Sequence, residues 1–100
     1  MKTPVTLDPY VIASLLPDLV GHDRHPSAFL TYVVIAAEAG GGWAALSHAQ
    51  LAERTGLSRR AIQLAVARLA RRGLVDVRRD GPTDTSRYRA LSPWRRDRSE

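Results

Sequence analysis

One stretch constrains the fold of this chain more than any other. It covers residues 47–72 and reads SHAQLAERTGLSRRAIQLAVARLARR. Ser47 is followed three positions later by Gln50, which is the spacing of a capping box and predicts the start of a helix. Gly56 predicts the end of that helix, because glycine adopts the left-handed conformation at a helix C-terminus at little cost. The stretch therefore predicts two helices joined by a tight turn.

The second helix is expected to begin after Ser58, a good N-cap residue, and to end before Gly73. Its apolar residues recur at the spacing of one buried helical face: Ile62, Ala65, Val66 and Leu69. This is the pattern of a helix-turn-helix unit, whose second helix enters the major groove of DNA. The alternative interpretation is an ordinary two-helix corner in another α domain.

The flanking sequence predicts the rest of the domain. Residues 26–39 are expected to form a helix that Gly40 ends. The apolar face expected for that helix is Phe29, Leu30, Val33, Val34 and Ala37. After it, residues 43–45 suit a very short strand, and LVDVRR and RYRAL alternate with period two on either side of a turn-rich loop. The expected fold is mainly α with a small β-hairpin: a winged helix-turn-helix with a three-helix core, a wing and an extra N-terminal helix.

The two ends of the chain are less regular. Asp8 and Pro9 fit the N-cap and first position of a short helix over YVIASLL. Pro17 either ends that helix or begins another short one, and DLVGHDRHP is interpreted as a loop. We expect an N-terminal extension over residues 1–25, the domain itself over residues 26–92, and a basic tail over residues 93–100 that is disordered beyond Trp94.

The charge is unevenly distributed along the sequence. The chain of 100 residues carries a net charge of +5, yet residues 1–46 sum to −2. Residues 47–100 hold thirteen arginines against six acidic residues, for a net charge of +7. A positive half of this kind favours a polyanionic partner. The alternative is a solvated surface in a protein that uses arginine throughout, since Lys2 is the only lysine.

The sequence lacks residues and segments that several classes of protein require. There is no cysteine, no apolar run of membrane-spanning length and no apolar core of a signal peptide, which favours a cytoplasmic, nucleoid-associated protein. His22 and His25 resemble half of a metal site without a third ligand, so we expect no metal and no cofactor. No nucleophile–base pair, paired carboxylates or phosphate-binding glycine loop is evident, so an enzyme is not expected.

From Ser27 to Leu91 the sequence resembles the winged helix-turn-helix superfamily of bacterial regulators. The stretch LAERTGLSRRAIQLAVARLARRGLVDVRRD is similar to the GntR and MarR families and to helix-turn-helix domains of plasmid and phage replication proteins. The last group looks closest, because its members also begin with a short helix. The resemblance implies sequence-specific binding to double-stranded DNA. The large effector domain of GntR proteins and the extra dimerisation helices of MarR proteins do not fit in 100 residues.

The helical wheel and the wing supply the candidate DNA-binding residues. Arg59, Arg60 and Gln63 suit base edges or phosphates near the start of the second helix, and Ala67 permits a close approach to the groove. The remaining candidates suit phosphate contacts: Ser47, Ser58, Arg78, Arg79, Thr83, Thr85 and Arg87.

We expect a transcriptional regulator that binds as a homodimer, because one small module makes few contacts. Two alternatives remain open. The first is a replication or conjugation protein of plasmid or phage type. The second is a winged-helix adaptor that binds another protein through its N-terminal segment or through Leu64, which lies on the outward face of the second helix.

Overall fold

The helix-turn-helix forms as the sequence predicts. The computed structural model describes residues 6–81 and 85–93, and in it helix α2 spans His48–Thr55 and helix α3 spans Arg59–Arg71. The Ser47 hydroxyl accepts a hydrogen bond from the backbone N–H of Gln50 at 3.0 Å, and the Gln50 side chain accepts one from the backbone N–H of Ser47 at 2.8 Å. This capping box fixes the start of α2. Gly56 then ends the helix with a φ of 82°, a conformation that other residues adopt only at a cost.

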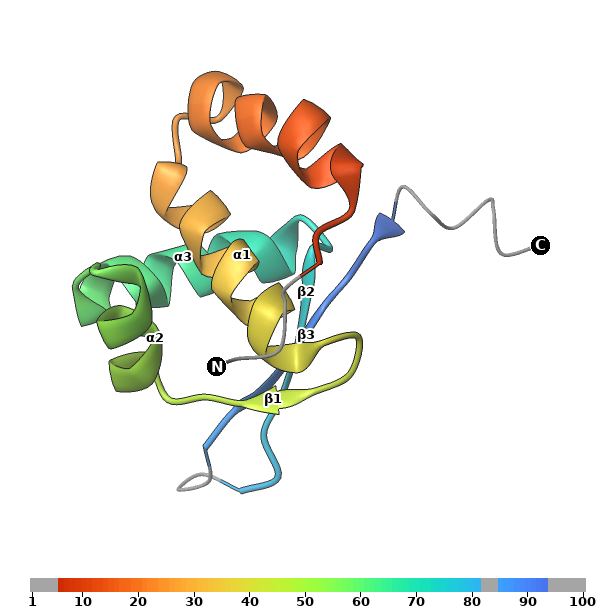
Figure 1. Ribbon diagram of the computed structural model, residues 1–100. Coiled ribbons are helices and arrows are strands. Elements are labelled where there is room, and N and C mark those ends of the chain that lie inside the picture. The colour runs from red at the N-terminus through yellow and green to blue at the C-terminus, as the bar shows by residue number, and fades with distance from the viewer. Residues whose placement is uncertain (1–5, 82–84, 94–100) are drawn as a thin grey trace, which may run out of the picture.

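A three-stranded antiparallel sheet lies beside the helices (Figure 1). Strands β1 (Ala44–Ala45), β2 (Val75–Arg78) and β3 (Arg87–Ala90) are arranged in the order β1-β3-β2. The β2–β3 hairpin is the wing, and β1, which forms within the short strand predicted over residues 43–45, pairs with β3. The predicted fold class, mainly α with a small hairpin in the order of a winged helix, is therefore confirmed.

Helix α1 (Pro26–Ala39) crosses the centre of the domain, but it buries a different face from the one expected (Figure 1). Phe29 is buried, whereas Leu30 is 44% exposed and Val33 and Val34 are only partly buried. Almost every position in this helix is apolar, so hydrophobicity alone does not select a face. The other residues that it buries are Ala28, Thr31, Tyr32 and Ile35.

Two hydrogen bonds explain how polar atoms can lie on the buried face of α1. The Thr31 hydroxyl donates a hydrogen bond to the carbonyl of Ser27 at 2.7 Å, so this hydroxyl has a partner although it is buried. The Tyr32 hydroxyl donates to the carbonyl of Leu91 at 3.0 Å, just beyond the end of β3. Tyr32 therefore ties α1 to the far end of the wing, and burial raises the pKa of its phenol above the usual 10.0.

The N-terminal segment forms two short helices with π-type turns, η1 (Val11–Leu15) and η2 (Pro17–His22). Pro17 begins a second short helix, which is one of its two predicted roles, and the loop predicted over DLVGHDRHP is wrong from Asp18 to His22, where Leu19 is buried. Val11, Leu15 and Leu19 follow one another at intervals of four and all enter the core that α1 and α3 share. The segment before α1 thus belongs to the same core, and the domain boundary at residue 25 stays a prediction.

Ion pairs attach the N-terminal helices to the C-terminal end of α3. The Arg72 guanidinium lies 2.8 Å from Asp23 and 3.0 Å from Asp18, and Arg68 lies 3.6 Å from the same Asp23 carboxylate. The hydrogen bond that Arg72 donates to Asp18, followed by the one that it donates to Asp23, raises the pKa of Arg72. Two arginines thus hold two carboxylates from a segment about fifty positions earlier.

Replacing Arg72 with methionine is expected to lower the melting temperature by about 4 to 8 °C. The pairs are one-third exposed, so the network contributes about 1 kcal/mol in a domain of this size. Thermal denaturation followed by circular dichroism measures the change. Arg71→Met is the matched control, because Arg71 is exposed and has no ion pair with the described residues. An equal effect of the two substitutions at low salt would contradict a role for the network.

No helix within residues 6–81 and 85–93 has the length and apolar character that a membrane crossing requires.

Candidate nucleic-acid interface

The outward face of α3 carries its polar and cationic side chains into solvent. Ser58 caps the helix, since its hydroxyl accepts a hydrogen bond from the backbone N–H of Ala61 at 3.0 Å. Ile62 and Leu69 are fully buried on the inner face. The sequence-predicted residues on the opposite side are all exposed: Arg59, Arg60, Gln63 and Ala67. Leu64, on the same side, is 55% exposed.

The start of α3 is positively charged for two reasons. Arg59 and Arg60 lie in the first turn, and neither forms an ion pair with any residue that the structure describes. The helix dipole adds a partial positive charge at the same end. Two exposed guanidinium groups without a carboxylate partner among the described residues therefore attract an anionic surface.

The wing divides its arginines between the two faces of the sheet. Arg78 lies opposite Arg87 in the β2–β3 register, and directly opposed residues share a face. Asp76 and Arg89 form the next pair on this outer face, with a salt bridge of 2.8 Å. On the opposite face, Val75 and Tyr88 are buried in the core, whereas Val77 is 42% exposed.

The outer-face arginines are engaged by other side chains. Arg87 forms a salt bridge with Asp80. Two guanidinium groups lie over the ring of Trp43, with Arg78 at 5.3 Å and Arg89 at 4.8 Å from the ring centroid. Of the predicted DNA-binding arginines of the wing, Arg78 and Arg87 thus already interact with Trp43 and Asp80 within the protein.

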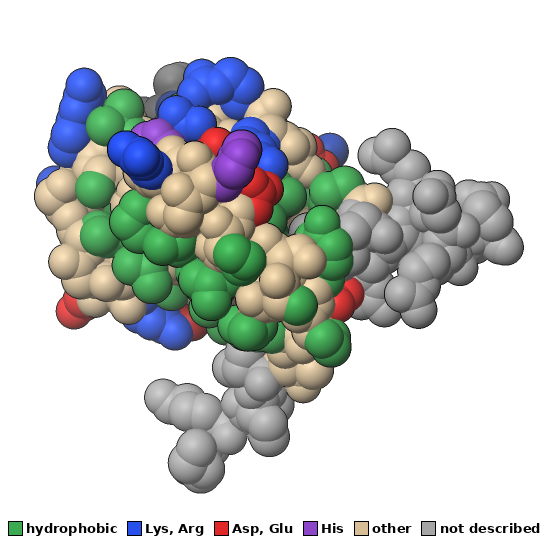
Figure 2. All heavy atoms as spheres, turned by 90° about the horizontal axis from the view of Figure 1, so that it is seen from above, with side chains coloured by type: hydrophobic (Ala, Val, Ile, Leu, Met, Phe, Trp, Pro, Cys, Tyr) green, Lys and Arg blue, Asp and Glu red, His purple; other side chains and the backbone are tan. Residues whose placement is uncertain are grey.

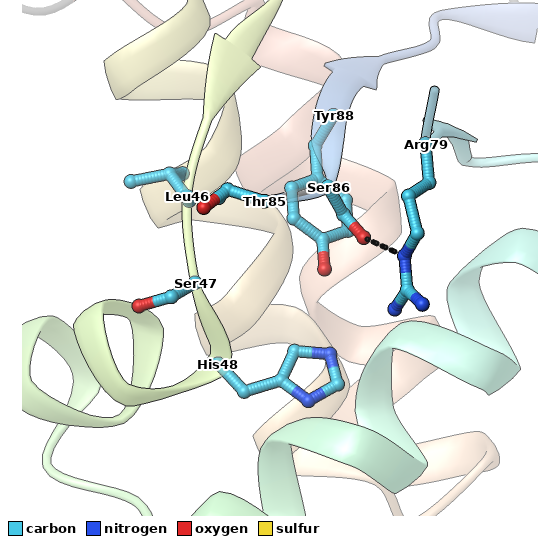
Figure 3. Close-up of a pocket in the computed structure, with 7 residues that line it drawn as sticks. All are labelled: Leu46, Ser47, His48, Arg79, Thr85, Ser86 and Tyr88. Carbon is cyan, nitrogen blue, oxygen red and sulfur yellow. Dashed lines mark hydrogen bonds between the residues drawn. The ribbon is translucent and has the colours of Figure 1, made fainter. Parts of the chain in front are cut away.

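Arg79 takes a different position, beside a hollow between the wing and the start of α2 (Figure 3). Its Nε lies 3.5 Å from the Ser86 hydroxyl. His48, the first residue of α2, extends into the same hollow, and the phenol of Tyr88 points into it from β3 (Figure 3). The volume is about 280 Å³, and the other lining residues are Leu46, Ser47 and Thr85.

Burial raises the pKa of the Tyr88 phenol above its ordinary value of 10.0, against the opposing effects of a hydrogen bond with Ser86 and the charge of Arg79. The group therefore stays protonated at neutral pH and can donate a hydrogen bond. Within the hollow, a protonated phenol, an imidazole and a guanidinium accordingly face the same space.

The predicted site residues form two groups in the structure. Ser58, Arg59, Arg60, Gln63 and Ala67 lie together along α3, whereas Ser47, Arg79 and Thr85 line the hollow. Thr83 lies outside the described residues, as do Trp94 and the basic tail. Their roles in binding stay predictions.

Sequence reasoning missed His48, Ser86 and Tyr88, which complete the hollow. A signal for Tyr88 was present, because strand alternation places it on the face opposite Arg87 and Arg89. Nothing local in the sequence indicates that the start of α2 meets the wing.

The two N-terminal histidines do not form part of a metal site in the described structure. His22 is exposed, and its Nδ1 lies 4.0 Å from Asp18 within the same short helix. Among residues 6–81 and 85–93, no group of three histidine or acidic side chains lies close enough to hold a metal ion.

Comparison with known proteins assigns this chain to a family. The family model of the MarR family matches residues 26–84, which run from the start of α1 into the wing. No curated protein and no solved structure matches the chain. The matched region covers more than half of the chain and includes the whole helix-turn-helix with β2. The chain is a winged-helix protein of the transcriptional-regulator type and belongs to the MarR family.

Proposed function

We propose that this protein is a regulator of transcription that binds double-stranded DNA in a sequence-specific manner by placing α3 in the major groove. The observation that carries the proposal is the exposed start of α3, where Arg59 and Arg60 lack ion pairs with the described residues. Arginine can bridge O6 and N7 of guanine, and Gln63, one turn further on, can pair with N6 and N7 of adenine.

The remaining candidates would position the helix on the duplex. Ser58 offers a hydroxyl and a helix N-terminus to a phosphate, and Ala67 adds little bulk where the helix meets the groove. The other backbone contacts that we propose are Ser47, Arg78, Arg79, Thr83, Thr85 and Arg87. Arg78 and Arg87 would have to reach phosphates without losing their contacts to Trp43 and Asp80.

Selection of bound sequences from a random duplex library tests the proposal directly. A regulator of this type should enrich one short motif, and fluorescence anisotropy should give an affinity for that motif at least about a thousandfold above random duplex. Enrichment of no motif, with binding that is equal for all duplexes, would contradict sequence-specific binding.

We predict that Arg79→Ala lowers the slope of log affinity against log salt by about one unit, because each phosphate contact releases about one counterion. Anisotropy titrations at several salt concentrations measure the slope. Arg24→Gln is the matched control, since it also removes one exposed positive charge but lies after η2. The slope of the control should remain that of the wild type. Equal slopes for both variants would place Arg79 away from the duplex.

A homodimer would supply a second recognition helix, and the N-terminal face is the surface that we propose for it. Figure 2 looks onto the end of the molecule where η1 and η2 lie, and hydrophobic side chains cover the middle of that face. Large exposed apolar side chains from this region and the first half of α1 are Tyr10, Ile12, Val20 and Leu30. Apolar side chains that gather on one face often mark a surface that binds another protein.

If this face joins two copies, Ile12→Lys should convert a dimer into a monomer. The side chain is 53% exposed, so the substitution should leave the fold intact while it places a charge in the interface. Size-exclusion chromatography with light scattering gives the mass. Val77→Lys, on the wing, is the control and should stay dimeric. A wild-type mass of one chain at all concentrations would exclude the dimer.

A second candidate function is that of an adaptor that binds another protein, and the exposed Leu64 on α3 favours it. An adaptor should bind random duplex at low salt no better than an unrelated protein of equal charge. The anisotropy measurement thus separates the two candidates. Mapping of the bound sites on the genome then distinguishes a transcriptional role from one at a replication origin.

A further inference from the structure

We propose that the hollow between α2 and the wing is a binding site for a phosphate group. The proposal concerns a site separate from the base-reading face of α3, and its link to DNA, though not the site itself, rests on the proposed function. The phosphate would be held by His48, Arg79 and the phenol of Tyr88, which face one another across the hollow (Figure 3).

The polar side chains that line this hollow can all donate hydrogen bonds. Its lining within the described residues holds a guanidinium, an imidazole, a phenol and the hydroxyls of Ser47, Thr85 and Ser86, but no carboxylate. Leu46 is the only aliphatic side chain among the described residues of this lining, so an apolar ligand has little surface to cover. Charge-assisted hydrogen bonds from such donors are the usual means of holding a phosphate oxygen.

The supporting contacts hold two of these donors in place. The Ser86 hydroxyl lies 3.5 Å from Nε of Arg79, whose guanidinium lies beside the hollow (Figure 3). Tyr88 is 99% buried, with its strand paired on both sides, so its phenol has little freedom to turn away. A pocket whose donors are already oriented loses less entropy when it binds an anion.

The start of α2 adds a further contribution. Ser47 and His48 line the hollow, and the first backbone N–H groups of a helix have no partner within it. The capping box satisfies those of Ser47 and Gln50. The positive end of the helix dipole therefore adds to the charge of Arg79, in a hollow that is large enough for a phosphate group.

Two sources of phosphate share this chemistry: the backbone of a DNA duplex and free inorganic phosphate. Nuclear magnetic resonance distinguishes them, with the His48 imidazole and Arg79 Nε–H signals as probes. Sodium phosphate is titrated against sodium chloride at constant ionic strength, and the selected duplex is titrated separately. His22, which is exposed on η2, is the internal control and should not shift.

The expected result is a saturable shift of His48 and Arg79, but not of His22, in at least one of the two titrations. Tyr88→Phe removes only the phenolic hydroxyl and should weaken that binding, and His48→Gln should weaken it by about tenfold. His22→Gln is the matched control for the second substitution. No specific shift with either phosphate or duplex would overturn the proposal, as would a shift that neither substitution weakens.

The two arms identify the source. If the duplex shifts the probes and displaces phosphate, and His48→Gln lowers duplex affinity, the site holds a backbone phosphate. If the duplex binds through α3 without shifting the probes, and phosphate alone shifts them, the ligand is the free anion. If no duplex binds at all while phosphate still shifts the probes, the proposed DNA-binding function fails and the phosphate site stands.

Discussion

A chain in which both Arg59 and Arg60 are replaced by alanine is expected to lose sequence-specific DNA binding and to keep its fold. Each arginine paired to a guanine accounts for about 1 to 3 kcal/mol of discrimination, so the double substitution should lower affinity for the selected site by about a thousandfold. Affinity for random duplex should fall much less, because the wing arginines and the rest of α3 keep their charge.

The fold should survive this change because both side chains are exposed and have no ion pairs with the described residues. Alanine is also at least as favourable as arginine within a helix. The Ser58 cap and the buried face of α3 remain intact. The melting temperature should therefore stay within about 3 °C of the wild type.

The measurement is an anisotropy titration of the selected duplex and a scrambled duplex at one salt concentration. The control removes two charges elsewhere, through Arg24→Gln with Arg71→Ala, both of which are exposed. It should lower the affinity for both duplexes equally and leave their ratio unchanged. If the α3 variant retains the wild-type ratio, Arg59 and Arg60 do not read the sequence.

The fold was predictable where single residues determine local geometry. Ser47, Ser58 and Gly56 fix both ends of α2 and the start of α3, because caps and left-handed turns depend on residue type. The buried face of α3 was equally clear, since its apolar and polar positions separate cleanly. The expected face of α1 was wrong because an almost wholly apolar helix has no polar side to orient it.

The loop predicted over DLVGHDRHP was wrong from Asp18 to His22 for a related reason. Its sequence contains proline and glycine, which favour a loop, yet burial of Leu19 and the pairing of Asp18 with Arg72 stabilise a helix there. Both interactions join residues that are far apart in the sequence. Local propensity carries no information about such contacts, so tertiary structure overrides it.

The candidate site shows the same limit. The arginines of α3 were predictable as exposed because one helix presents them, but the wing arginines depend on partners across the sheet. Strand register brings Arg87 near Asp80 and Arg78 onto Trp43, and it leaves Arg79 beside His48. Alternation indicates which residues share a face, but not which helix packs against that face.

The largest effect on stability is expected from Ile62→Asp, which should leave the chain unfolded at room temperature. Ile62 is fully buried in the middle of α3 and belongs to the core cluster that joins α1, α2 and the wing. The substitution removes a large apolar side chain and places a carboxylate in the hydrophobic core. The combined cost is about 5 kcal/mol or more, comparable to the whole stability of a small domain.

Leu64→Asp provides the matched control, because it makes the same chemical change two residues later on a side chain that is 55% exposed. Both substitutions put an aspartate in the interior of α3, and the loss of helix propensity is below about 1 kcal/mol in each and no smaller for Leu64. Circular dichroism and a thermal melt should show a cooperative transition for Leu64→Asp and none for Ile62→Asp. A cooperative melt of the Ile62 variant would show that α3 presents a different face to the core, and Arg59, Arg60 and Gln63 would then no longer be directed toward DNA.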